Sequence, residues 1–282
     1  MSKRHILGSA GWLCGRRPRT AIQSIGLRAS CVCVLVAWSQ VRAPTDARAA
    51  ELVVLDPGHG GHLSGAQNAD GVEEKTIVLA IALAARRALA ADGYRVVLTR
   101  NDDRHVELAD RIDLANRKGA AAFVSIHGNF SPVSSRRGVE TYVLSAAASD
   151  ETSLTLAHLE NEGEVFDRIV DEDAFGGGAV DRDQADLRFI LSDLVRMNAH
   201  QESGALALNV QDSVGRLDGF GPSRGLRQAP FRVLKGARMA AVLVEVGYLS
   251  NKRQGAFLAT QNAQNAAGTA IARGVGRFLR AR

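Results

Sequence analysis

Val53-Val54-Leu55-Asp56-Pro57-Gly58-His59-Gly60-Gly61 is the stretch around which the remaining sequence is organised. It begins as an apolar run typical of a buried strand. The run ends in a cluster of proline and glycine that places one histidine on a turn. Because binding sites of open α/β sheets gather at the carboxyl ends of the strands, His59 is well placed to meet a ligand.

Predicted strands and helices alternate from this stretch to residue 144. A helix begins at Glu73 or Glu74, where early carboxylates suit a helix N-terminus. The other predicted elements are strands at 94–98, 121–126, 139–144 and 241–246, a helix around 108–114, and a closing helix at 261–279. This order predicts an α/β fold, with a mostly parallel, twisted sheet flanked by helices.

Residues 149–222 interrupt the alternation. A helical pattern at 153–169 is followed by an acidic, glycine-rich stretch at 171–186 and a long helical pattern at 187–217. The regular sheet resumes at Arg224, and a short strand is expected at 231–234. We therefore expect a helical insertion at 149–222 within a single domain that spans residues 50–282.

Residues 1–49 have the features of a secretory signal peptide. A basic start precedes an apolar run at 29–38, and Ala47-Arg48-Ala49 offers a small-x-small cleavage site. The apolar run is too short for a stable bilayer anchor, so none is expected after cleavage, although an uncleaved N-terminal anchor is the alternative. Arg16-Arg17 leaves the general secretory and twin-arginine routes both open.

Charge and cysteine content narrow the function classes. The chain has 35 basic and 30 acidic residues, but residues 1–49 hold eight of the basic ones and only Asp46 among the acidic ones. The remaining chain is slightly acidic, so the basic pI gives no ground for a nucleic-acid partner. All three cysteines, Cys14, Cys31 and Cys33, lie in the leader, which excludes disulfides and cysteine-ligated zinc from residues 50–282.

Four positions combine metal-binding or acid–base chemistry with strand ends and helix starts. His59 and His127 follow predicted strands, Glu73 or Glu74 begins the first helix, and Glu245 lies inside an apolar strand. Two imidazoles and a carboxylate form a ligand set that zinc accepts, with one position left open. Zinc polarises a carbonyl, and a second carboxylate that is not a ligand could transfer protons, as amide hydrolysis requires.

Each of these residues also has a structural interpretation. A histidine in a glycine-rich loop is more often a turn residue, and Glu74 could simply complement the helix dipole. Glu245 differs, because a carboxylate inside Val242-Leu243-Val244-Glu245-Val246 is costly to bury without a partner. The spacing of the four residues along the chain is too wide to form a local motif.

A series of motifs resembles the zinc-dependent N-acetylmuramoyl-L-alanine amidases of the amidase_3 type, a family of cell-wall hydrolases. The motifs occur in the family's order and extend over nearly all of residues 51–280. They are Leu55-Asp56-Pro57-Gly58-His59-Gly60-Gly61, Glu74-Lys75, Leu98-Thr99-Arg100 with Asp103, Leu108, Arg111 and Ala115-Asn116, Phe123-Val124-Ser125-Ile126-His127-Gly128-Asn129, Gly138-Val139-Glu140-Thr141-Tyr142, Arg224-Gly225-Leu226-Arg227-Gln228, Val233-Leu234-Lys235-Gly236 and Leu243-Val244-Glu245-Val246-Gly247-Tyr248-Leu249-Ser250-Asn251.

The resemblance implies the roles of the site residues. By position, His59, Glu74 and His127 would be zinc ligands, and Glu245 would be the catalytic acid and base. Glu74 is chosen over Glu73 because the family's ligand directly precedes a lysine. The implied substrate is peptidoglycan, at the amide between the lactyl group of N-acetylmuramic acid and L-alanine. The implied setting is the periplasm, in wall remodelling and daughter-cell separation.

The insertion resembles the regulatory segment of division amidases from Gram-negative bacteria, in which a helix blocks the zinc until a periplasmic LytM-type activator displaces it. We therefore expect self-inhibition, with Glu160 or Glu164 in the open zinc position. One alternative is a peptidoglycan-binding or regulator-binding protein without catalysis on the same fold. Another is a zinc carboxypeptidase, which the ordered motifs disfavour.

Overall fold

The computed structural model describes residues 50–161 and 182–282. Asp46–Arg282 form one compact unit. The predicted leader at 1–49 lies outside the described residues, as does most of the acidic, glycine-rich stretch. Among the helices in the described ranges, none has the length and apolar character needed to cross a membrane.

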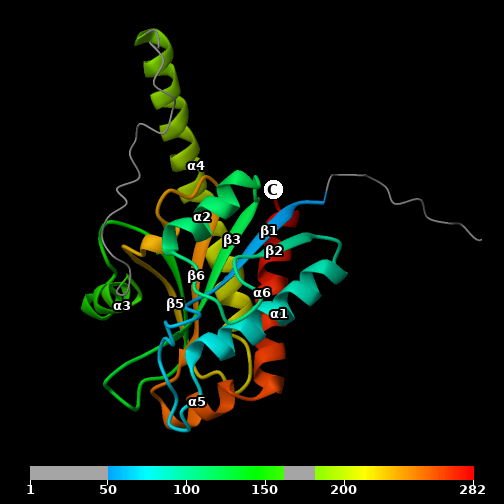
Figure 1. Cartoon of the computed structure of the whole chain (residues 1–282), viewed down its shortest axis with the longest axis vertical. Helices are drawn as coiled ribbons and strands as arrows, with labels where there is room; N and C mark the ends of the chain where they lie inside the picture. The colour runs from blue at the N-terminus through cyan, green and yellow to red at the C-terminus, as the bar shows by residue number, and fades with distance from the viewer. Residues whose placement is uncertain (1–49, 162–181) are drawn as a thin grey trace, which may run out of the picture. The chain divides into compact units, whose positions relative to one another are not determined.

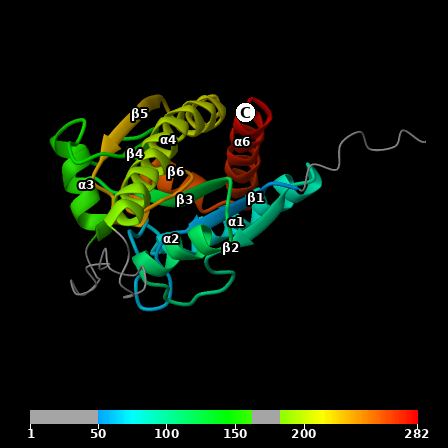
Figure 2. The same ribbon diagram turned by 90° about the horizontal axis from the view of Figure 1, so that it is seen from above.

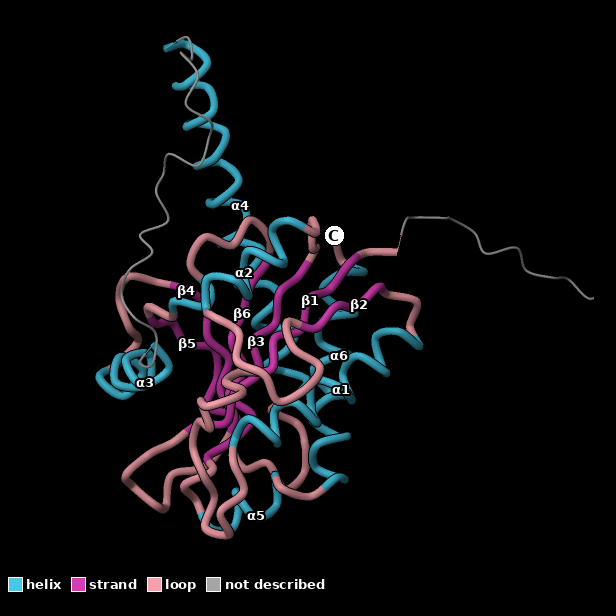
Figure 3. Tube along the Cα trace, viewed as in Figure 1, coloured by secondary structure: helices cyan, strands magenta, loops and turns pink. Residues whose placement is uncertain are grey.

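Six strands form one sheet in the order β2-β1-β3-β6-β4-β5 (Figures 1 and 3). All neighbouring pairs are parallel except β4 and β6, which are antiparallel. The predicted mostly parallel α/β sheet is therefore confirmed. The strands are β1 Leu52–Pro57, β2 Arg95–Leu98, β3 Ala122–Asn129, β4 Val139–Leu144, β5 Ser223–Ala229 and β6 Ala240–Tyr248.

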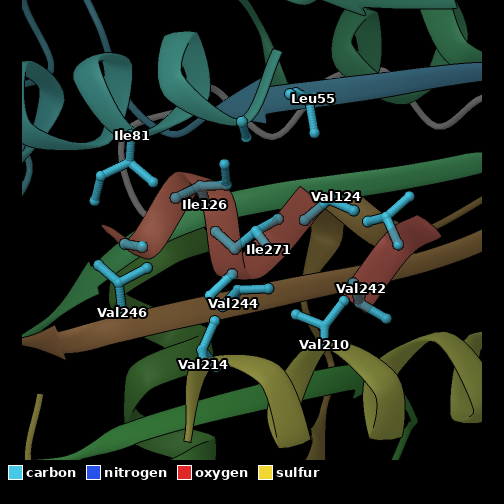
Figure 4. Close-up of a cluster of buried hydrophobic side chains, with 14 of the residues drawn as sticks. Leu55, Ile81, Val124, Ile126, Val210, Val214, Val242, Val244, Val246 and Ile271 are labelled. Carbon is cyan, nitrogen blue, oxygen red and sulfur yellow. The ribbon is translucent and has the colours of Figure 1, made fainter. Parts of the chain in front are cut away.

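Helices cover both faces of the sheet. Figure 2 shows α4 and α6 on one side of β3 and β6, and α2 on the other. The helices are α1 Glu74–Ala91, α2 Leu108–Arg117, α3 Glu151–Asn161, α4 Arg182–Val214, α5 Lys252–Leu258 and α6 Gln261–Arg280. One core cluster joins α1, α4 and α6 to the sheet (Figure 4), and a second contains side chains from α2 and α3.

The topology places the starts of two strands beside the ends of three others. Since β4 runs antiparallel to β6, and β5 runs parallel to β4, both begin at the edge where β1, β3 and β6 end. This edge therefore collects residues from the carboxyl ends of β1, β3 and β6 and from the amino ends of β4 and β5. It is the edge at which the sequence places His59.

Two local features differ from the sequence-based expectation. The strand β3 continues through Asn129, so His127 lies within it rather than after it. Residues Arg232–Leu234 form a short 3₁₀ helix instead of a strand, because Pro230 has no amide hydrogen with which to continue a ladder. The long helical pattern at the end of the expected insertion packs in the core, as its apolar positions indicate, since Leu206 and Val210 of α4 are fully buried.

Candidate metal centre

Four side chains converge at the carboxyl end of the sheet. His59, Glu74, His127 and Glu160 each direct one ligand atom into a cluster whose members all lie within 4.8 Å of one another. The Nε2 atom of His59 is 3.0 Å from Oε1 of Glu74 and 3.2 Å from Oε2 of Glu160. The Nδ1 atom of His127 is 3.2 Å and 2.8 Å from the same two oxygens.

The turn after β1 fixes the two imidazoles against each other. His59 has a φ of 55°, a left-handed conformation that is uncommon for a residue with a side chain. The preceding residue, Gly58, lies close to the His127 ring, and a Cβ added there would come within 2.4 Å of the imidazole. Glycine at this position therefore allows the backbone turn and the second imidazole to occupy adjoining space.

Glu74 is held in place by two backbone amides. Its Oε1 accepts a hydrogen bond from the Gly128 N–H, and its Oε2 accepts one from the Ala66 N–H, both at 2.9 Å. As the first residue of α1, it is 1% exposed. Its neighbour Glu73 instead points to Lys75 with a side chain that is 36% exposed. The structure therefore brings Glu74, and not Glu73, to the histidines.

The cluster fits a small divalent cation. His59 Nε2, His127 Nδ1 and Glu160 Oε2 are buried, and within the described residues none of them has a hydrogen bond of acceptable geometry despite the short separations. Donors bound to one tetrahedral zinc at about 2.0–2.1 Å lie about 3.3 Å apart. The observed N···O separations of 2.8–3.2 Å are close to this value. Two imidazoles with carboxylates are also ligands that zinc readily accepts.

Electrostatics at the cluster favour positive charge. Burial alone would lower the pKa of His59, but the carboxylates of Glu74 and Glu160 raise it to about 9. The same carboxylates raise the pKa of His127 despite complete burial. Burial opposes ionisation of Glu74, yet the two imidazoles lower its pKa. Buried carboxylates that depend on neighbouring cations in this way suit a site for a metal ion.

Glu245 lies next to this cluster on the neighbouring strand. It pairs in register with His127 across β3 and β6 and is completely buried. Within the described residues, neither carboxylate oxygen has a hydrogen-bond partner. Burial, and to a smaller extent the charge of Glu160, raises the pKa of Glu245 well above its usual value, and the charge of His127 opposes this shift. A buried carboxyl group with a raised pKa is suited to carrying a proton.

Two buried arginines hold the turn that carries His59. Arg111 donates from Nη1 to Asp56 at 2.8 Å and from Nη2 to the His59 carbonyl at 2.9 Å. Arg100 donates from Nη2 to the Gly58 carbonyl at 2.7 Å. Neither arginine is among the site residues that the family resemblance implies. Asp56, a carboxylate inside an apolar strand, was the available signal that a buried cation would have to lie nearby.

Within the described residues, the other histidines do not contribute to the cluster. Glu164 lies outside the described residues. The rings of His62 and His105 contact each other in a tilted arrangement, with centroids 4.5 Å apart, and His158 and His200 are exposed. Of the two carboxylates expected in the open position, Glu160 lies within the described residues and belongs to the cluster.

Comparisons with known proteins agree with the sequence motifs. The Amidase_3 family model, described as N-acetylmuramoyl-L-alanine amidase, matches residues 53–277. AmiA of Salmonella typhimurium is 34% identical over 225 residues, which are 79% of this chain and 74% of that protein. AmiC of Neisseria meningitidis is 31% identical over 228 residues, which are 81% of this chain and 52% of that protein. The amidase AmiC2 of Nostoc punctiforme superposes with a TM-score of 0.59 at 30% identity, covering 82% of this chain and 97% of that one.

Proposed function

The chain belongs to the Amidase_3 family and is an N-acetylmuramoyl-L-alanine amidase of peptidoglycan remodelling, and on this premise we propose that it is an exported zinc enzyme of daughter-cell separation. The bond cleaved is the amide between the lactyl group of N-acetylmuramic acid and L-alanine of the stem peptide. The observation that carries the proposal is the convergence of His59, Glu74 and His127 beside a buried, unpartnered Glu245.

In this proposal His59, Glu74 and His127 hold the zinc ion. Zinc supplies a Lewis acid for the scissile carbonyl and makes water in the site more acidic. Glu74 is oriented for this role by the amides of Gly128 and Ala66. Arg111, through the carbonyl of His59, keeps the β1 turn in place. Such outer contacts fix the direction of a ligand and support its affinity for metal.

Glu245 performs the proton transfers. It takes a proton from the water whose oxygen forms the new bond to the lactyl carbonyl carbon. It then delivers that proton to the nitrogen of L-alanine as the C–N bond breaks, so the products are a free carboxyl group and a free amine. Burial and the neighbouring carboxylates raise the pKa of Glu245, which allows it to hold the proton between the two steps.

The helix α3 keeps the enzyme inactive. Glu160, its penultimate residue, contacts both histidines and takes the position that water and the scissile carbonyl need. The helix is attached at its carboxyl end, where Asn161 bonds to the Pro230 carbonyl and to the Arg232 amide. Displacing α3 would open the site, and a periplasmic LytM-type activator is the partner proposed for this step.

Export completes the proposal. The signal-like residues 1–49 would direct the chain to the periplasm, where peptidoglycan lies, and residues 50–282 would be the mature enzyme. Residues 149–222 would be its regulatory segment, with the buried end of α4 retained in the catalytic fold.

Product analysis tests this function. The full chain carrying Glu160→Gln is incubated with purified sacculi, and the soluble products are resolved by mass. We expect intact stem peptides that begin with L-alanine, loss of this release after chelation, and recovery with zinc. Glu245→Gln in the same background should keep zinc but release no peptide. Shortened stem peptides would indicate a carboxypeptidase, and no products would indicate a binding protein, and either result would overturn the proposal.

A further inference from the structure

A row of charged side chains runs from the metal centre across the sheet. His127 on β3 pairs in register with Glu245 on β6, which pairs in register with Glu140 on β4. On β5, Arg224 donates from Nε to Oε1 of Glu140, and Nε of Arg227 lies 3.3 Å from Oε2 of the same carboxylate. The row therefore spans four neighbouring strands and ends in two arginines.

On the sheet, these two arginines share a single counter-ion, Glu140. Glu140 is 1% exposed and already accepts hydrogen bonds from Arg224 and from the hydroxyls of Tyr142 and Tyr248. Its single charge is therefore balanced by Arg224. The Nε atom of Arg227 is buried and has no hydrogen bond of acceptable geometry within the described residues. Positive charge at Arg227 is thus in excess on the sheet itself.

The charge of Arg227 is balanced instead by the regulatory segment. Its Nη1 donates to Oδ2 of Asp150, the residue directly before α3. Asp150 and Glu160 lie ten residues apart along one helix, which corresponds to about 15 Å. The segment thus presents one carboxylate to the metal centre and a second carboxylate to Arg227.

We propose that Arg227 is a specificity-determining residue that binds a carboxylate of the stem peptide, at a subsite that Asp150 fills while α3 covers the sheet. This inference rests on the proposed function, because it takes the metal centre as the place of amide cleavage. The helix α3 would then occupy both the cleavage position and the peptide position, and substrate would replace both of its carboxylates.

The dimensions suit a short peptide. His127 and Arg227 lie on strands three spacings apart, about 14 Å, and the Arg227 side chain reaches back to Glu140 on β4. An extended peptide advances about 3.3–3.6 Å per residue. Carboxylates two to four residues beyond the scissile amide therefore fall within reach. The planar guanidinium of arginine matches a carboxylate in a bidentate geometry, which gives selectivity for an acid over an amide.

The test compares two soluble substrates in the full chain carrying Glu160→Gln. One is a muropeptide with free stem carboxylates, and the other is the same muropeptide with those carboxylates amidated. Arg227→Gln should raise KM for the free acid by about tenfold or more, since charge-assisted hydrogen bonds are strong, and should leave kcat and the amidated substrate unchanged. Arg227→Lys should recover part of the loss, and Asp150→Asn should lower KM for the free acid.

Arg87→Gln, on the exposed side of α1, is the matched control and should change neither KM. An equal loss on both substrates would show a structural role for Arg227, and an unchanged KM would show no role, so either result overturns the subsite. If the Glu160→Gln chain cleaves neither substrate, the proposed function fails separately. Calorimetry with the free stem peptide then tests the subsite by itself. If neither amidation of the peptide nor Arg227→Gln changes the measured affinity, the subsite is overturned.

Discussion

At the scale of single residues, Glu73 and Glu74 show how little separates a surface charge from a ligand. The two glutamates are adjacent, but only Glu74 lies in the cluster with His59 and His127. Glu73 is the residue before α1 and reaches toward Lys75. Residue type and spacing leave both candidates open, and the family resemblance alone selected Glu74 before its contacts were known.

Glu74→Gln should abolish tight zinc binding without unfolding the chain. The amide side chain keeps an oxygen and nearly the same shape, but it loses the negative charge that a divalent ion requires. We expect zinc affinity to fall by about a hundredfold or more, measured by competition with a chelating dye. Glu73→Gln is the matched control, and an equal loss in both variants would refute the assignment of Glu74.

Asp56 supplies a prediction about stability and pH. Burial disfavours its charge, but Arg111 together with the hydroxyls of Thr99 and Ser125 holds the pKa of Asp56 below its usual value of 3.8. The stabilisation is therefore complete above about pH 4 and is lost as the pH falls through the lowered pKa.

Asp56→Asn leaves Arg111 buried without its carboxylate, so the free energy of unfolding at pH 7 should fall by about 3–5 kcal/mol. Urea denaturation of both proteins at pH 7 and pH 3 measures the difference. The difference in the free energy of unfolding should narrow at pH 3, because this pH is below the usual pKa of 3.8 and the unfolded chain then binds the proton that folded Asp56 resists. A difference that stays constant between the two pH values would contradict this role for Asp56.

Arg100 and Arg111 belong to the motifs of the resemblance, but their burial and their contacts were beyond prediction for a physical reason. Arg100 follows a predicted strand, and Arg111 lies on a predicted polar helix. At both kinds of position an arginine is usually solvated. Only tertiary structure shows that they end beneath the β1 turn, where they donate to the carbonyls of Gly58 and His59. Local patterns record which face a residue occupies, but they do not record the distant backbone that it meets.

At the scale of elements, α3 is attached mainly by its ends and by one apolar side. Leu156 and Ala157 are buried against the sheet, whereas Leu154 and Leu159 are 39% and 45% exposed. The sequence predicted a helix here and named Glu160 as one of two candidates for the open position. The contacts of Glu160 with both histidines depend on how the helix is placed against the sheet, which no periodicity specifies.

Glu160→Gln should raise amidase activity in the full chain. Removing the charge weakens the contact with both imidazoles and allows α3 to leave the site more often. We expect release of stem peptides from sacculi to increase by about tenfold or more, measured with zinc in excess. Glu151→Gln, at the exposed first turn of α3, is the control. Unchanged activity in Glu160→Gln would rule out inhibition through this contact.

The helix α4 contributes to the core as well as to the predicted insertion. Leu206 is fully buried, whereas Leu208 on the same helix is 60% exposed. Leu206→Ala should lower the free energy of unfolding by about 2–5 kcal/mol through lost burial and a cavity. Leu208→Ala should change it by less than about 0.5 kcal/mol. Equal effects in urea denaturation would show that this part of α4 is not packed in the core.

At the scale of the whole molecule, the alternating strands and helices were sufficient to predict the parallel part of the sheet. The antiparallel β4 was not predicted, because strand direction depends on how the chain crosses the molecule and not on the pattern inside a strand. Yet this reversal brings Glu140 and Arg224 to the edge that holds His127 and Glu245. The least predictable part of the topology therefore supplies the proposed peptide subsite.

The metal centre at this edge depends on the entire fold, because its ligands come from separate segments of the chain. His59 follows β1, Glu74 begins α1, and His127 lies in β3, so no short segment contains the set. The arginines and backbone amides that orient these ligands are contributed by yet other segments. We therefore expect the site to be formed before metal arrives, and to bind zinc without a change of fold.

Anomalous X-ray diffraction at the zinc edge, on crystals of the full chain grown with zinc, tests this arrangement most directly. The account predicts one dominant anomalous peak within bonding distance of His59 Nε2, His127 Nδ1 and a carboxylate oxygen of Glu74, and no such peak in Glu74→Gln crystals. A peak elsewhere, or an equally strong peak at this position in the variant, would contradict it.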